Sequence, residues 1–167
     1  MVKLSAEIIS STKSDDELFR LIGEELDRRL PNGRRASDDF VSELQNLPIG
    51  LRSMAATYEL DVSLALDDLG CHFGNWHHKG LAVETEKGLV ELGAQRLSEL
   101  FRDAFWHAQR FWDELGSDNL SDWYHDSEFE RAVMPLNEEA WSILKESDSS
   151  LLMYWLKYAR EHPDNLS

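Results

Sequence analysis

Apolar residues recur at helical spacing through most of the chain, and the first clear run follows a serine. Ser14 precedes the acidic residues 15–17. This order is typical of a helix start, because the hydroxyl accepts a free backbone N–H and the carboxylates face the positive end of the helix dipole. Apolar positions then recur every three or four residues up to Leu30. Ser37 repeats the signal before a shorter run, so the pattern predicts an N-terminal pair of helices within residues 1–47.

The middle of the chain predicts two longer helices on either side of a glycine-containing break. Over residues 49–70 apolar side chains occupy more than one face, as expected of a helix inside a bundle. The stretch CHFGNWHHKG, residues 71–80, combines glycines with histidines and indicates a loop. The strongest periodicity covers residues 89–115 and predicts a long helix, with a bend expected at Gly93.

The C-terminal third begins with a polar stretch, residues 116–127, that predicts a loop. Three helical segments are expected after it, at residues 129–134, 138–145 and 151–160. No segment alternates between apolar and polar positions over the length of a strand. The patterns together predict a single all-α domain over residues 1–167, a compact bundle of about six to eight helices.

The composition is strongly acidic. Asp and Glu number 32 against 17 Lys and Arg, which gives a formal net charge of −15. A charge of this sign repels nucleic acid and anionic lipid, so direct binding to DNA, RNA or a membrane surface is disfavoured. The excess is concentrated in residues 113–148, where eleven acids face two bases.

The cysteine content and the lack of long apolar runs bear on location. The single cysteine, Cys71, excludes an intramolecular disulfide and a clustered-thiol zinc site, and it fits a reducing compartment. The N-terminus lacks the apolar core of a signal peptide, and no stretch approaches the roughly 18 continuous apolar residues of a membrane span. These features predict a cytoplasmic protein.

One candidate for chemistry is the histidine-containing stretch. Cys71, His72, His77 and His78 follow two aspartates, and imidazole together with carboxylate suits zinc or a related ion. Adjacent histidines cannot both face one ion from a helix, and no second cluster accompanies them. A solvated loop held by its aromatic residues is the alternative interpretation.

A second candidate is the set Glu99, Asp103 and His107, which occupies one face of the predicted long helix at i, i+4 and i+8. The spacing fits a metal or an acid–base pair, and equally a water-facing stripe of surface ion pairs. The chain contains no nucleophile elbow, no phosphate-cradling glycine loop and no His-Glu-x-x-His motif. We therefore expect neither enzymatic activity nor a cofactor.

The acids of residues 113–148 support two interpretations. They form a solvated face that maintains solubility, or they present charge to a basic partner, because carboxylates on helices can occupy a groove that otherwise binds DNA phosphates. Aromatic side chains often anchor interfaces, so two aromatic neighbours are included among the candidates. The residues predicted to contact a partner are Asp118, Asp122, Trp123, Tyr124, Asp126, Glu128 and Glu130.

Short motifs elsewhere in the chain follow a known pattern. They are Leu47-Pro48, Tyr58, Leu60-Asp61, Leu69, Phe73-Gly74-Asn75, Leu92-Gly93-Ala94 and Tyr158-Ala159-Arg160-Glu161-His162-Pro163. With these motifs, residues 48–167 resemble the bacterial DNA-mimic protein family, whose domain is otherwise of unknown function. The resemblance implies an all-helical fold without a cofactor, and occupation of the DNA-binding surface of a transcription regulator. The family usually carries an Asn-Gly-Gly-Phe turn where this chain has Leu66-Asp67-Asp68-Leu69, so either the turn is built differently or the helix continues.

These observations predict a non-enzymatic acidic protein that binds a basic protein surface, with DNA mimicry as the form that the resemblance implies. The expected partner is a DNA-binding regulator or a basic toxin, and a homodimer would extend the negative array. Two alternatives stay open: a small metal-dependent enzyme that uses the histidine-containing stretch, and an immunity-type protein that caps a toxin.

Overall fold

The computed structural model describes residues 4–146 and 150–167, which form eleven α-helices and one short 3-10 helix, η1, without a strand. Eight of the helices have seven or more residues, so the predicted all-α fold is confirmed. Within these residues, no helix combines the length and the apolar character that crossing a membrane requires. In chain order the elements are α1 (Ala6–Ser11), α2 (Asp15–Arg29), α3 (Asp38–Gln45), α4 (Ile49–Leu66), α5 (Leu69–Asn75), α6 (Lys79–Glu91), α7 (Gln95–Arg110), α8 (Trp112–Leu115), α9 (Leu120–Tyr124), α10 (Glu128–Glu146), α11 (Leu152–Glu161) and η1 (Pro163–Leu166).

The serine signals of the N-terminal region act as predicted. The Ser14 hydroxyl accepts the backbone N–H of Glu17 at 3.3 Å and begins α2, and the Ser37 hydroxyl accepts that of Phe40 at 3.2 Å and begins α3. The sequence pattern did not predict α1, which Ser5 caps in the same way.

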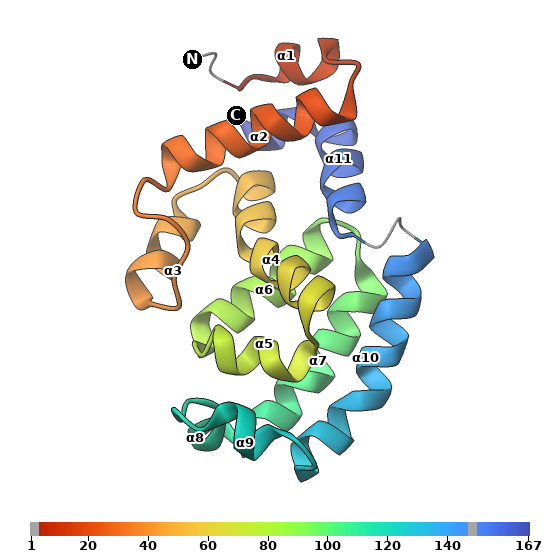
Figure 1. The fold of residues 1–167 in the computed structure, drawn as a ribbon. Coiled ribbons are helices and arrows are strands. Elements are labelled where there is room, and N and C mark those ends of the chain that lie inside the picture. Colours follow the sequence, from red (N-terminus) through yellow and green to blue (C-terminus); the bar gives the residue numbers. More distant parts are fainter. Residues whose placement is uncertain (1–3, 147–149) are drawn as a thin grey trace.

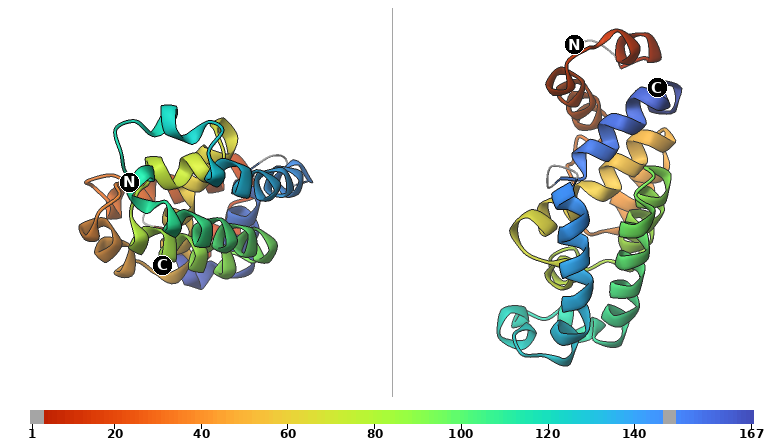
Figure 2. Two further views of the ribbon diagram at one scale, coloured as in Figure 1. Left: turned by 90° about the horizontal axis from the view of Figure 1, so that it is seen from below. Right: turned by 90° about the vertical axis from the view of Figure 1, so that its right-hand side faces the viewer.

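The helices are arranged along one long axis (Figures 1 and 2). At one end, α1 contacts η1 and α2 contacts α11, while α4 and α6 occupy the middle. Helices α7 and α10 run side by side toward the opposite end, where α8 and α9 lie.

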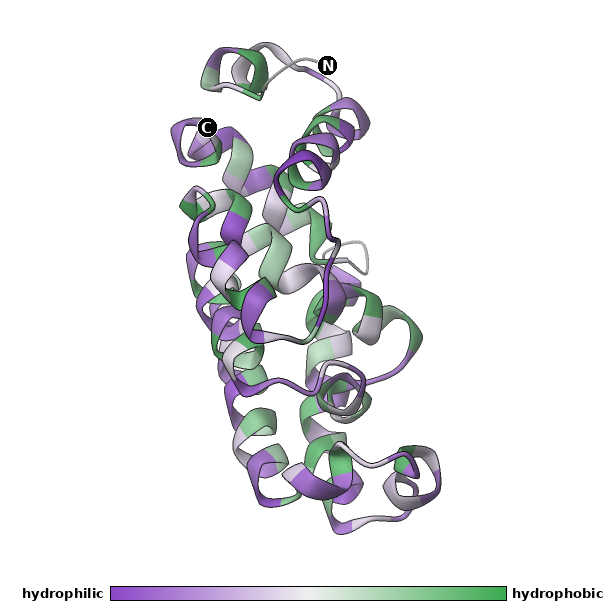
Figure 3. Cartoon of the chain, turned by 90° about the vertical axis from the view of Figure 1, so that its left-hand side faces the viewer, coloured by the Kyte–Doolittle hydropathy of each residue, from purple (hydrophilic) through white to green (hydrophobic). Residues whose placement is uncertain are grey.

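Two clusters of buried apolar side chains follow this axis. One contains residues of α2, α4 and α11, and the other contains residues of α5, α7 and α10. Helices α4 and α6 contribute to both, since Leu51 and Leu81 belong to the first cluster while Leu60 and Leu89 belong to the second. Hydrophilic and hydrophobic residues accordingly alternate along the helices at helical spacing (Figure 3).

The prediction of a loop at residues 71–80 is wrong, because most of this stretch belongs to α5 and to the first turn of α6. Helix α4 ends at Leu66, and the Asp68 carboxylate accepts the backbone N–H of Cys71 at 2.8 Å to cap α5. Of the two forms left open for the turn that replaces Asn-Gly-Gly-Phe, the chain thus adopts a differently built turn.

Gly93 ends a helix instead of bending one. Its φ of +78° suits glycine, and its N–H donates to the carbonyl of Val90 at 3.0 Å. The N–H of Ala94 donates to the carbonyl of Leu89 at 2.8 Å, which completes a Schellman arrangement. The predicted long helix of residues 89–115 is therefore divided between α6, α7 and α8.

Helix α10 runs without interruption through Pro135, although the sequence predicted two separate segments there. The proline lies on an exposed position, whereas Val133, Asn137 and Ala140 are buried. The Asn137 side-chain oxygen accepts the N–H of Leu69 at 2.8 Å and so links α10 to the start of α5. Packing of the buried face maintains the helix despite the donor lost at the proline.

Candidate partner-binding surface

The predicted contact residues lie at the end of the molecule formed by α8, α9 and the first turn of α10 (Figure 1). Residues 116–127, predicted as a loop, contain the short helix α9. Most acids of this region are exposed to solvent, and we call them the acidic end. Its members are Asp113, Glu114, Asp118, Asp122, Asp126 and Glu128.

Two glycines of α5 allow α9 to lie close against it. A Cβ at Gly70 would lie 2.2 Å from the Tyr124 hydroxyl, and a Cβ at Gly74 would lie 2.2 Å from a methyl of Leu120. Because the glycines are four residues apart, they share one face of α5. Any larger residue at either position would displace α9.

Tyr124 is a buried anchor, 3 % exposed, and not a surface residue as predicted for a partner contact. Its hydroxyl donates to the Asp68 carboxylate, with 2.9 and 3.0 Å to the two oxygens. Burial and the adjacent Asp68 charge raise the pKa of this phenol far above its usual range. The residue therefore fixes α9 to the body through a charge-assisted hydrogen bond.

Trp123 is half-buried. Its ring stacks on Phe129 with 6.2 Å between centroids and lies 5.9 Å from Phe111. One part of the indole thus packs onto the second apolar cluster, and the remainder lies at the surface beside Asp122. This position is consistent with a contact residue and also with a partly covered core residue.

Hydrogen bonds at the start of α10 fix the backbone of the acidic end. The Ser127 hydroxyl accepts the N–H of Glu130 at 3.0 Å, and the Glu130 carboxylate accepts the N–H of Asp126 at 2.7 Å. This exchange is close to a capping box. Asp126 has a φ of 61°, a left-handed conformation that aspartate tolerates better than most residues.

The predicted contact acids differ in their partners. Glu128 lies 3.3 Å from Arg110, and Glu130 lies 3.7 Å from His125 in addition to its backbone role. Within residues 4–146 and 150–167, no ion pair involves Asp118, Asp122 or Asp126. These three carboxylates are exposed and carry charge that no basic side chain of the described structure offsets.

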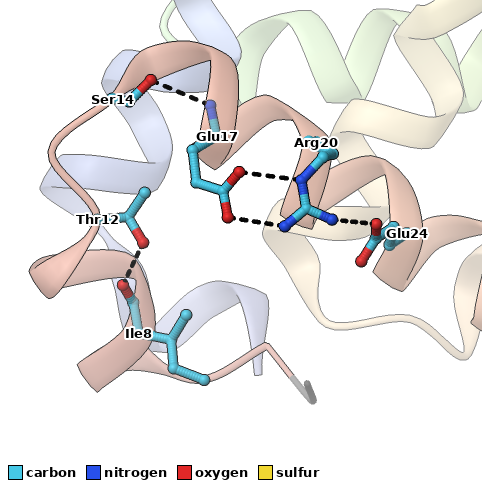
Figure 4. Close-up of polar contacts among 6 residues, drawn as sticks. All are labelled: Ile8, Thr12, Ser14, Glu17, Arg20 and Glu24. Carbon is cyan, nitrogen blue, oxygen red and sulfur yellow. Dashed lines mark hydrogen bonds and ion pairs between the residues drawn. The ribbon is translucent and has the colours of Figure 1, made fainter. Parts of the chain in front are cut away.

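Acids at the opposite end are bonded differently. On α2, Glu17 and Glu24 lie on either side of Arg20, and Glu17 accepts two hydrogen bonds from it, at 2.7 and 2.9 Å (Figure 4). The Arg20 guanidinium holds the pKa of Glu17 below its usual value. Local pairing therefore offsets the charges of Glu17 and Glu24, whereas Asp16 and Asp27 of the same helix are exposed and make no ion pair in the described structure, as on α9.

The C-terminal acids of the acidic segment are not part of the acidic end. Glu138, Glu139 and Glu146 lie along α10, beyond its first turn. Glu139 accepts hydrogen bonds from Arg96 at 2.6 and 3.0 Å, which lower its pKa. Asp148 lies outside the described residues. The predicted surface is thus shorter than residues 113–148.

The three histidines considered for a metal site each contact a different partner. His72 is buried and its Nδ1 lies 2.9 Å from the Ser63 hydroxyl, whereas His77 stacks on Trp112 at 4.2 Å and bonds its carbonyl. His78 caps α6 through the N–H of Leu81. In the part of the chain that the structure describes, no three residues of the types His, Cys, Asp and Glu are grouped to hold an ion.

The second candidate set lies on α7 as predicted. Glu99 pairs with Arg96 at 2.8 Å, and Asp103 lies 3.9 Å from Arg102. The Nδ1 atom of His107 is buried without a hydrogen-bond partner among the described residues. This arrangement matches the surface ion pairs of the alternative interpretation for the two acids.

The sequence did not assign Asp67 and Asp68 to the acidic segment. Burial raises the pKa of Cys71 to about 12, and the negative charges of Asp68, Asp67 and Glu130 add to the shift. Asp68 also joins Tyr124 to α5, so both aspartates lie beside the acidic end. No spacing in the sequence signals this neighbourhood, because it depends on the docking of α9.

Comparison with protein-family models, with curated proteins and with solved structures finds no match for this chain.

Proposed function

We propose that this chain is a non-enzymatic binding protein that presents its acidic end to a basic protein surface. The supporting observation is the set Asp118, Asp122 and Asp126, which are exposed and lack basic partners in the described structure, on a segment fixed by Tyr124. Unpaired carboxylates repel one another and add nothing to the fold, so a partner is a physical reason for keeping them together.

The partner class we propose is a DNA-binding regulator in the cytoplasm. A groove lined with Lys and Arg that accepts phosphates also attracts aspartates held on a rigid body. Attraction over several ångströms would accelerate encounter, and the exposed part of Trp123 would supply a desolvated contact. The short motifs that resemble DNA-mimic proteins point to the same partner class, although no family model matches the chain. A basic toxin offers similar chemistry, so the identity of the bound protein separates the two.

The test compares two triple variants of equal charge. In the first, D118N, D122N and D126N remove three of the six charges of the acidic end; asparagine also tolerates the left-handed conformation at residue 126. In the matched control, D27N, E161Q and D164N remove three exposed charges on α2, α11 and η1, near the other end of the molecule.

Each protein is immobilised and exposed to a lysate of the source organism at low salt, and bound proteins are eluted with a salt gradient. We expect wild type and the control to retain a common basic protein that elutes between about 50 and 200 mM salt, and the first variant to lose it. The purified partner should then be displaced from its DNA by wild type. The proposal would be refuted if both triple variants retained the basic protein equally, or if its elution did not depend on the salt concentration.

A further inference from the structure

A second surface feature lies near the opposite end of the molecule, between α2, α4 and α11. It is a cavity of about 130 Å³ lined by three aromatic side chains and one carboxylate. These residues are Phe19 of α2, Tyr58 and Asp61 of α4, and Trp155 of α11. None of them belongs to the acidic end, so this feature is independent of the function proposed above.

The three rings are set at an angle to one another around Trp155. Its centroid lies 6.4 Å from that of Phe19 and 6.0 Å from that of Tyr58, with both ring planes tilted by 41°. The indole N–H donates to the Thr57 hydroxyl at 3.0 Å, which satisfies its only donor and fixes the ring. The cavity is therefore bounded by a fixed indole ring that requires no hydrogen bond from an occupant, and by the rings of Phe19 and Tyr58 beside it.

One of these rings already has a cation against it. The guanidinium of Arg34 lies 3.8 Å from the centroid of Tyr58, although Arg34 does not line the cavity. A ring face attracts cations through its quadrupole, and the attraction is stronger where water is excluded. The guanidinium thus occupies one face of the Tyr58 ring, and its charge repels a second cation, a repulsion that a negative charge at the cavity has to offset.

Asp61 supplies a fixed negative charge at the same cavity. Its carboxylate accepts the backbone N–H of Leu151 at 2.6 Å and the Ser150 hydroxyl at 3.2 Å, so it is oriented by the start of α11. No Lys or Arg pairs with it within the described residues. A carboxylate has about four lone-pair sites, and these two donors leave part of its charge available to an occupant.

We propose that this cavity binds a small organic cation through a methylated ammonium group. Aromatic rings are not metal ligands, and a primary ammonium is strongly hydrated and needs several acceptors. A methylated ammonium is bulky and weakly hydrated, and aromatic enclosures are its usual recognition site. At about 130 Å³ the cavity is close in size to an engineered apolar cavity of about 150 Å³ that holds benzene, a molecule comparable in size to such a head group.

Choline is the probe, and its uncharged carbon isostere, in which a tert-butyl group replaces trimethylammonium, is the matched control ligand. Titration calorimetry on the full chain should give saturable binding of choline at millimolar concentrations and at least tenfold weaker binding of the isostere. Equal binding of both compounds would identify a merely apolar cavity, and absence of choline binding would also overturn the proposal.

Three substitutions locate the site. Asp61→Asn retains an acceptor for Leu151 but removes the charge, and should weaken choline binding about tenfold. Phe19→Leu removes a partly exposed ring and should weaken it about two- to fivefold, whereas Phe19→Trp should strengthen it. Asp27→Asn removes the same charge elsewhere on the surface and should leave the affinity unchanged. A loss with Asp27→Asn equal to that with Asp61→Asn would show attraction to the overall charge only.

Discussion

The stability of this protein should depend on pH through one buried histidine. His72 of α5 is 3 % exposed, and its ring makes edge contacts with Phe73 and Phe101, 5.6 and 5.8 Å between centroids. The Ser63 hydroxyl, 2.9 Å from Nδ1, already donates its proton to the Glu59 carbonyl. The Nδ1 atom of His72 therefore carries a proton and donates it to the Ser63 oxygen. The neutral imidazole has this proton, so the contact needs no positive charge on the ring.

Burial lowers the pKa of His72 from 6.5 to about 4, because the charged ring would lose its hydration. Between about pH 4 and pH 6.5, His72 is therefore protonated in the unfolded chain and neutral in the folded chain. As pH falls below 6.5 the unfolded state is favoured, and the loss stops growing below about pH 4. With 1.36 kcal/mol per pKa unit, the free energy of unfolding falls by about 2 kcal/mol at pH 5 and by about 3 kcal/mol in the limit.

The assay is urea unfolding of wild type and His72→Phe between pH 7.5 and pH 5. The phenyl ring retains most of the packing, and Ser63 keeps its bond to Glu59. Over this range carboxylates with lowered pKa values remain ionised, and both proteins share them. We expect the wild type to lose about 2 kcal/mol more than the variant. Parallel curves for the two proteins would refute the reasoning that the ring is buried and neutral.

Three further outcomes are expected. Gly88→Ala should lower the free energy of unfolding by about 1–3 kcal/mol, because the added Cβ would lie 2.9 Å from a backbone oxygen of α4. Gly23→Ala has open space around the added Cβ and should raise the free energy of unfolding by about 0.5–1 kcal/mol. Urea unfolding of both variants measures the two changes. Tyr124→Phe should cost about 1.5–3 kcal/mol in the same assay, since Asp68 loses a charge-assisted donor. Cys71, with its pKa raised to about 12, should react with a thiol reagent at pH 8 at least about a hundredfold more slowly in the native protein than in urea.

The parts of the fold that depend on neighbouring residues could be predicted from the sequence. Ser14 and Ser37 begin helices because their hydroxyls reach N–H groups three residues away, which requires no tertiary contact. The N-terminal cap of α5 was equally local, since Asp68 bonds the N–H of Cys71. It was overlooked because nearby glycines and histidines suggested a loop.

Glycine signals were ambiguous for a physical reason. Gly93 has a positive φ and ends α6, whereas the sequence pattern predicted only a bend there. Gly70 and Gly74 instead lie inside α5 and provide space for side chains of α9. A glycine required by its own backbone and a glycine required by a neighbouring helix look alike in a sequence, so the second kind was misread.

The candidate surface was only partly predictable for the same reason. Exposure of Asp118 and Asp122 follows from their polar surroundings in the sequence. The burial of Tyr124 does not, because its acceptor Asp68 lies 56 residues earlier in the chain. Glu139 likewise pairs with Arg96, which lies on another helix and 43 residues earlier in the chain. This pairing could not be predicted from the sequence, and it offsets the charge of one acid of the expected surface.

The carboxylates near α9 and α10 divide into two groups, and this division makes the proposed function separable from stability. Glu130 accepts a backbone N–H and Asp68 accepts a phenol, so neutralising either would disturb the fold. Asp118, Asp122 and Asp126 make no such contacts through their carboxylates in the described structure, and close charges of one sign only repel. Asparagine at these three positions should therefore leave the unfolding free energy unchanged or slightly raised while partner binding is lost. A variant that lost both would show that the three aspartates hold the fold together, and the case for a recognition surface would fail.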